Sequence, residues 1–156
     1  MKAKDGVLNY LNNILTAELT AAHQYLLHGA MCHNWGYARL HHHLHERVMD
    51  EIHHTEELMN HILYLEGQPN MQRLGTVNVG ATVSKQFAND LKLEQADLKL
   101  LREAIAHCAK VGDFTTRHKL EEMCVETEEH IDWIETQQET IKQVGLENYL
   151  SEQMKK

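Results

Sequence analysis

Five ionisable side chains occupy positions where a helical pattern calls for apolar ones. The inward-facing positions of the periodic segments are mostly apolar, and the exceptions are Glu18, Glu51, His54, Glu94 and His130. Buried carboxylates are costly unless they are protonated, paired or bound to a metal. Carboxylates with one imidazole per metal are typical ligands of Fe or Mn, whereas thiolates favour Zn or Cu(I). The pattern predicts a carboxylate-rich metal site, with a buried polar network as the alternative.

The spacing of these residues is stronger evidence than any single motif. The chain has one E-x-x-H, from Glu51 to His54, and chance alone gives about one in a chain this rich in Glu and His. Glu18 and His54 are 36 residues apart, and so are Glu94 and His130. An offset of 76 carries the first pair onto the second. Since each pair lies about equally far from the turn between its two helices, all four side chains should meet at one level of a bundle.

One position breaks this repeat. The same offset carries Glu51 to Thr127, so the second half lacks the carboxylate of its E-x-x-H. A hydroxyl is a weak ligand and supplies no bridging charge. Glu126 lies four residues before His130 and flanks the same face, which makes it a candidate substitute ligand. Bridging carboxylates can hold two metals, and without a substitute we expect the second to bind weakly or only in passing.

Four long segments and one short one must position these residues. Helical periodicity covers residues 5–34, 37–65, 83–111 and 114–144, and a short helix is expected at 146–153. Short breaks at Trp35-Gly36 and at Gly112-Asp113 make two antiparallel hairpins. The connection 66–82 can span a helix of about 40 Å, at about 3.3 Å per extended residue. We therefore expect an all-α, ferritin-like four-helix bundle with one long crossover between helices 2 and 3 and a short fifth C-terminal helix, as a single domain over 1–156.

Composition narrows the function classes. The chain has 156 residues, 42% of them hydrophobic, and a net charge of −8, which argues against nucleic acid as a partner and favours cations. Three scattered Cys form no CxxC pair and predict reduced thiols. The N-terminus lacks the apolar core of a signal peptide, and no stretch reaches 18 apolar residues. We expect a cytoplasmic protein that does not bind a membrane.

The sequence resembles the bacterioferritins over essentially its whole length. The matching stretches are Glu18 with His23-Gln24-Tyr25, Asn34-Trp35-Gly36, Asp50-Glu51 with His54, Leu65-Glu66-Gly67-Gln68-Pro69-Asn70, Leu101-Arg102-Glu103-Ala104-Ile105, His130-Ile131-Asp132-Trp133 and Gly145-Leu146-Glu147-Asn148-Tyr149-Leu150. The resemblance implies a 24-subunit shell that oxidises Fe(II) at a di-iron centre inside each subunit and stores ferric mineral. The family's ligands map onto Glu18, Glu51, His54, Glu94 and His130, with a Glu expected at Thr127. Tyr25 matches a family tyrosine just outside the ligands.

The resemblance also shows a second departure. The family binds haem between paired subunits through a Met directly after the second-helix Glu, where this chain has Ile52. Haem is therefore not expected in a homo-oligomer, although a mixed shell with a haem-binding subunit stays open. Glu46 and Asp50 lie in the region between the family's di-iron site and the cavity and are candidates for an iron route. The neighbouring His41, His42, His43 and His45 are interpreted as a solvated face, with surface metal capture as the alternative.

The sequence is compatible with three functions. The first is an iron-storage ferroxidase, and the second is a shell subunit with an impaired centre, which Thr127→Glu would largely restore. The third is another di-iron bundle enzyme such as a rubrerythrin-like peroxidase, against which the missing CxxC pairs argue. We expect iron as the cofactor, in a di-iron centre of which one site is weak, and Fe(II) and ferric mineral as the cargo of the storage functions.

Overall fold

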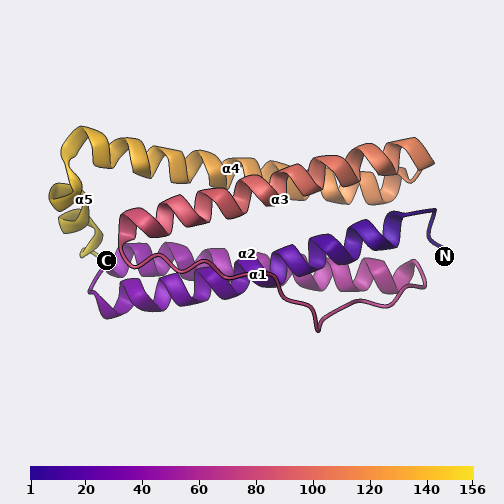
Figure 1. The fold of residues 1–156 in the computed structure, drawn as a ribbon, viewed down its shortest axis with the longest axis horizontal. Coiled ribbons are helices and arrows are strands. Elements are labelled where there is room, and N and C mark those ends of the chain that lie inside the picture. Colours follow the sequence, from indigo (N-terminus) through magenta and orange to yellow (C-terminus); the bar gives the residue numbers. More distant parts are fainter.

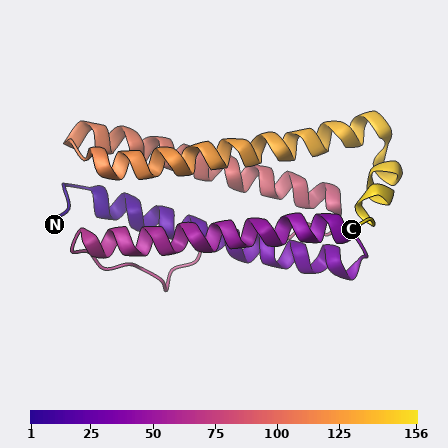
Figure 2. The same ribbon diagram turned by 180° about the vertical axis from the view of Figure 1, so that it is seen from behind.

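Five helices and no strands make up the computed structural model, which describes residues 1–156. The helices are α1 (Val7–Asn34), α2 (Ala38–Tyr64), α3 (Val83–Val111), α4 (Phe114–Val144) and α5 (Leu146–Gln153). Two hairpins, α1 with α2 and α3 with α4, stack into a four-helix bundle, and α5 folds across one end of it (Figures 1 and 2). The predicted bundle with one long crossover and a short fifth helix is confirmed, and its helix ends lie within two residues of those expected.

The turn between α3 and α4 follows from two adjacent residues. Gly112 ends α3 with a left-handed backbone, φ +77°, which a glycine adopts without strain. Asp113 then caps α4, because its carboxylate accepts a 3.0 Å hydrogen bond from the Thr116 amide. These are the stop and start signals that the sequence predicted.

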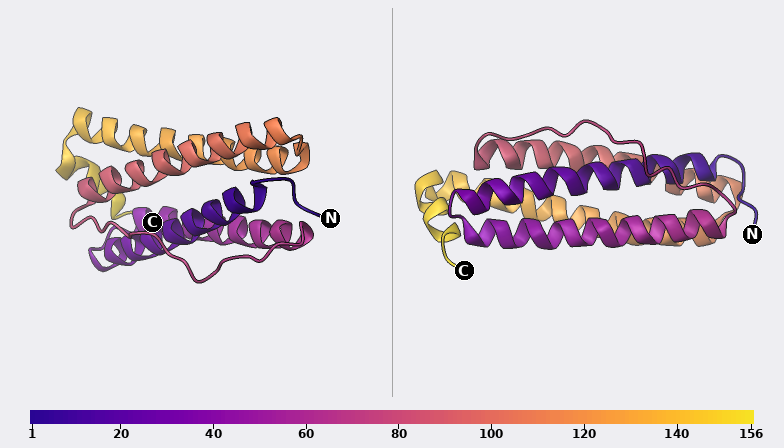
Figure 3. Two further views of the ribbon diagram at one scale, coloured as in Figure 1. Left: turned by 45° about the vertical axis from the view of Figure 1, so that its right-hand side comes forward. Right: turned by 90° about the horizontal axis from the view of Figure 1, so that it is seen from below.

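The crossover is held against α1 by a ladder of polar residues. In Figure 3 it runs along the outside of the bundle, from the end of α2 back to the start of α3. Every fourth residue of α1 accepts a hydrogen bond from it, and the pairs are Asn12 with Asn70, Thr16 with Arg73, Thr20 with Gly75, Gln24 with Asn78 and His28 with Gly80. Residues four apart share one helix face, so a single stripe supplies partners for an irregular segment.

Asp90 of α3 accepts hydrogen bonds from the last two α1 residues of this ladder. Its Oδ1 accepts hydrogen bonds from Gln24 Nε2 at 2.8 Å and from His28 Nδ1 at 2.9 Å. The Nε2 of His28 in turn accepts from the Gly80 amide at 2.9 Å. One carboxylate thus links α1, α3 and the crossover. Gly80 fits here because a Cβ would lie 2.3 Å from the Gln86 backbone nitrogen.

The apolar core is divided into two clusters. One lies towards the start of α1 and includes Leu11, Leu15, Leu58 and Ile62. The other lies towards the end of α1 and includes Tyr25, Leu44, Phe87 and Ile134. The predicted ligand residues lie between the two, at the middle of the helices. No helix combines the length and the apolar character that crossing a membrane requires.

Removing the Asp90 carboxylate should destabilise the fold, because two buried side chains would lose their acceptor. We expect Asp90→Ala to lower the free energy of unfolding by about 2–3 kcal/mol and the thermal midpoint by about 5–10 °C. Asp132→Ala, at an exposed position of α4, is the matched control and should leave the midpoint unchanged. Equal midpoints for the two variants in a thermal melt would contradict this role.

Candidate metal centre

The five residues predicted from spacing lie buried in the bundle interior, contributed by all four long helices. The exposed fractions are 3% for Glu18 of α1, 1% and 3% for Glu51 and His54 of α2, 1% for Glu94 of α3 and 6% for His130 of α4. They occupy one level because the hairpin turns are equally distant from them in sequence. Their surroundings differ, however. Glu18, Glu51 and His54 form one compact group. Glu94 and His130 contact other residues.

Glu18, Glu51 and His54 form a site that fits one metal ion. Their ligand atoms lie within 4.8 Å of one another. The Nδ1 of His54 is 3.1 Å from Glu18 Oε2 and 3.7 Å from Glu51 Oε2. The i, i+3 spacing of Glu51 and His54 places both on one face of α2, and α1 supplies the facing carboxylate. Two carboxylates with an imidazole make a donor set suited to iron.

Glu126 contacts the far side of the same imidazole. Its carboxylate reaches across from α4 to His54 Nε2, while its side chain stays half exposed. Histidines that bind metals commonly donate their second ring N–H to a carboxylate, which fixes the orientation of the ring. The structure therefore places Glu126 as a partner of His54. Its predicted role as a substitute ligand beside Thr127 stays a prediction.

Electrostatics within the group follow from burial and close contact. Burial and the neighbouring Glu51 raise the pKa of Glu18 well above its usual range. Burial alone would raise the pKa of Glu51 too, but close contact with Glu18 and His54 and the charge of Arg47 lower it to about 2. Burial disfavours a charged His54, but the carboxylates of Glu18 and Glu51 outweigh it and raise the pKa of His54 to about 11. Without metal, this imidazole holds a proton between two carboxylates.

The second metal position expected from the resemblance does not fit a metal ion. The guanidinium of Arg47 lies there, with Nη2 2.9 Å from Glu51 Oε1 and 3.4 Å from Glu94 Oε1. Tyr25 donates a 2.5 Å hydrogen bond to the same Glu94 oxygen. The Thr127 hydroxyl is turned to its own helix and donates to the Met123 carbonyl at 2.9 Å.

His130 lies beside this position without a polar partner. Its Nε2 is buried and makes no hydrogen bond. The ring packs edge-on against Tyr25 and is stacked near His43 and Trp133. Burial, together with the positive charge of Arg47, lowers the pKa of His130 to about 2, so the ring is neutral.

Sequence reasoning missed Arg47, although a signal for it was present. Arg47 is one turn before Glu51 and two turns before His54, which puts it in the inward phase of α2 between Leu44 and Glu51. A cation in an inward stripe next to carboxylates is as informative as the carboxylates themselves. Asp97 was also missed. It lies one turn after Glu94, and burial and the nearby carboxylates raise its pKa to about 9.

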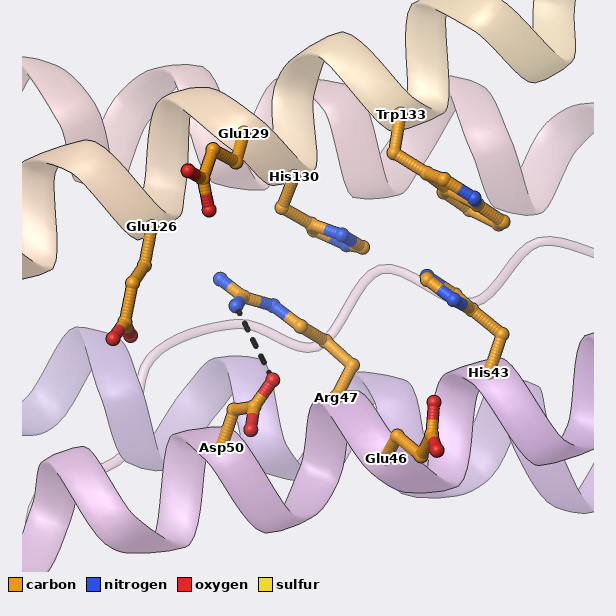
Figure 4. Close-up of a pocket in the computed structure, with 8 residues that line it drawn as sticks. All are labelled: His43, Glu46, Arg47, Asp50, Glu126, Glu129, His130 and Trp133. Carbon is orange, nitrogen blue, oxygen red and sulfur yellow. Dashed lines mark ion pairs between the residues drawn. The ribbon is translucent and has the colours of Figure 1, made fainter.

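A pocket of about 380 Å³ lies between α2 and α4, beside the centre (Figure 4). Arg47 and His130 line it from the centre, and the carboxylates of Glu46, Asp50, Glu126 and Glu129 line its more exposed part. Glu46 and Asp50, the predicted iron route, thus lie at the pocket. The predicted role is not tested by this placement.

The histidine cluster at the start of α2 is only partly a solvated face. His42 and His45 are exposed, as expected. His43 instead stacks on Trp133 of α4 with ring centroids 3.5 Å apart, and burial lowers its pKa to about 4. On the same helix, Ile52 is 42% exposed and presents no atom that can bind haem iron.

The fold and the buried carboxylate–histidine group define a ferritin-like four-helix bundle, and residues 8–144 match the ferritin-like domain family. Bacterioferritin BfrA of Mycobacterium tuberculosis is 42% identical over 149 residues, which cover 96% of this chain and 94% of that protein. A bacterial ferritin of Pseudomonas aeruginosa is 39% identical over 155 residues, covering 99% of this chain and all of the relative. The chain belongs to the bacterioferritin family.

Metal binding at the Glu18–Glu51–His54 site should strengthen as pH rises, because the ion must displace the proton that His54 holds. Between pH 6 and 8 we expect the Co²⁺ affinity to rise by about tenfold per pH unit for each proton released. Competition titration against a chelator measures this. The His54→Ala variant serves as the control, since subtracting its binding removes the contribution of surface histidines. A pH-independent affinity would contradict the protonated resting state.

Proposed function

We propose that this chain is a subunit of a cytoplasmic iron-storage shell of 24 copies, in which Fe(II) enters each subunit and ferric mineral collects in the cavity. The observation that carries the proposal is the buried Glu18–Glu51–His54 group in a chain that aligns with bacterioferritins along almost its whole length. Because the relatives' names and the donor set point to the same metal, iron is the cargo that the site suits best.

Different residues of the subunit attract Fe(II), bind it and orient its histidine ligand. The carboxylates of the pocket, Glu46 and Asp50 among them, outnumber its single arginine and attract cations from solvent. Glu18, Glu51 and His54 then bind the ion between two apolar clusters, where it is shielded from bulk water. Glu126 holds the imidazole in the orientation that presents Nδ1 to the ion.

Oxidation by this subunit on its own is proposed to be slow. Reduction of oxygen to peroxide takes two electrons, and two neighbouring Fe(II) ions supply them together. Thr127 and Arg47 leave the second position without the ligands for a second iron, which favours the impaired-centre hypothesis over a complete ferroxidase. A mixed shell with a second subunit type would supply both fast oxidation and haem, which Ile52 cannot bind.

Assembly and iron loading test this proposal together. Light scattering should give a particle of 24 subunits that fills with ferric mineral under aerobic Fe(II) addition. Stopped-flow absorbance should show no rapid phase corresponding to two iron ions per subunit, and initial oxidation at least about tenfold slower than in a bacterioferritin with a complete ligand set. A monomer or dimer at every concentration would exclude the shell, and a rapid two-iron phase would exclude the impaired centre.

A further inference from the structure

Arg47 brings a positive charge into the centre that no metal-site pattern requires. Its side chain is 7% exposed, although it comes from a helix whose neighbouring Glu46 and Asp50 reach solvent. Nη2 lies 2.9 Å from Glu51 and 3.4 Å from Glu94, whereas Nη1 is 3.9 Å from Asp50 at the pocket. Figure 4 shows the guanidinium of Arg47 reaching from α2 towards α4.

The guanidinium and its neighbours engage the ligand atoms that a second metal would need. Glu94 is held by the Tyr25 hydroxyl and by Arg47. Of the two Glu51 oxygens, Oε1 pairs with Arg47, and Oε2 stays without a hydrogen bond, 3.7 Å from His54. A bridging carboxylate would offer one oxygen to each metal, and here one of the two oxygens is given to an arginine instead.

The charges of the centre balance with one metal ion. Glu18, Glu51 and Glu94 carry three negative charges when ionised, and Arg47, which stays protonated in proteins, carries one positive charge. One divalent ion makes these four almost fully buried groups neutral, whereas two would leave them with an excess of two positive charges. Thr127 removes one negative charge from the family pattern and Arg47 adds one positive, which together equal the charge of a divalent ion.

We propose that the guanidinium of Arg47 takes the place of the second metal ion, so that the centre binds a single divalent ion at Glu18, Glu51 and His54. This inference rests on the proposed use of that site for iron. It also revises the expectation that Thr127→Glu largely restores the centre, because the new carboxylate would lie near Arg47 and pair with it.

His130 becomes dispensable for metal binding under this arrangement. Glu94 is engaged by two donors and the Thr127 hydroxyl is turned away, while the buried Nε2 of His130 makes no hydrogen bond. One imidazole without carboxylates offers too few ligand atoms to hold a divalent ion. His54 and His130, equivalent in the sequence repeat, are therefore expected to differ completely in their importance.

Anomalous diffraction from Co²⁺-soaked crystals tests the inference, because it locates each ion and separates the centre from surface histidines. The wild-type centre should show one peak per subunit, at Glu18, Glu51 and His54. His130→Ala should keep this peak and His54→Ala should lose it. Neither result depends on iron storage or on any oxidation rate.

Substitutions at the second position supply the decisive comparison. Thr127→Glu alone should still show one peak, whereas Arg47→Gln combined with Thr127→Glu should show two. Arg102→Gln is the matched control, since Arg102 pairs with Glu128 on the surface at 2.8 Å and should leave the single peak unchanged. Circular dichroism and particle size confirm that each variant is folded before it is soaked.

The outcomes separate this inference from the proposed function. A second peak in the centre of the wild-type protein or of Thr127→Glu alone, or a single peak in the centre of the folded double variant, would overturn the role of Arg47 while leaving the iron site intact. A wild-type centre without any peak would overturn the iron site and the inference with it.

Discussion

Three carboxylates from three helices meet in the interior of this bundle, and their burial is the constraint on which the site depends. Glu18, Glu51 and Glu94 are each almost fully buried, where ionised carboxylates are costly without positive charge between them. The structure supplies it from α2 alone: His54 faces Glu18, and Arg47 joins Glu51 to Glu94. Under the proposed function, a divalent ion would replace the proton of His54, and the carboxylates of Glu18 and Glu51 would then be its ligands.

The rest of the fold offsets the free-energy cost of burying these carboxylates and fixes their positions. Apolar clusters above and below the centre supply the burial that stabilises the helices, since about 25 cal/mol is gained per Å² of apolar area removed from water. The long crossover lets α3 and α4 pack beside α1 and α2 at the correct level, and the polar ladder along α1 fixes its path. The two apolar clusters and the crossover therefore position the centre, although none of their residues belongs to the Glu18–Glu51–His54 group.

Arg47 contributes both to the pocket beside the centre and to the charge balance within it. Arg47 forms part of the pocket between α2 and α4 and also part of the ion-pair network inside. On the proposed iron route past Glu46 and Asp50, an ion would meet the guanidinium of Arg47 before it reached the carboxylate of Glu51. Under the proposed function, this geometry would direct a cation to the side of Glu18 and His54, because the other side already holds the positive charge of Arg47.

The sequence by itself determined the helices, the crossover and the level at which five ligand-type residues meet. Those features follow from local periodicity, from Gly112 and Asp113 as stop and start signals, and from equal distances to the turns. It also revealed Thr127 as a break in the repeat. Only the tertiary structure decided that Arg47 lies between Glu51 and Glu94, that Glu126 contacts His54 and that His130 has no partner. These are contacts between side chains of different helices, and no spacing along one chain specifies which of several long side chains fills a shared interior position.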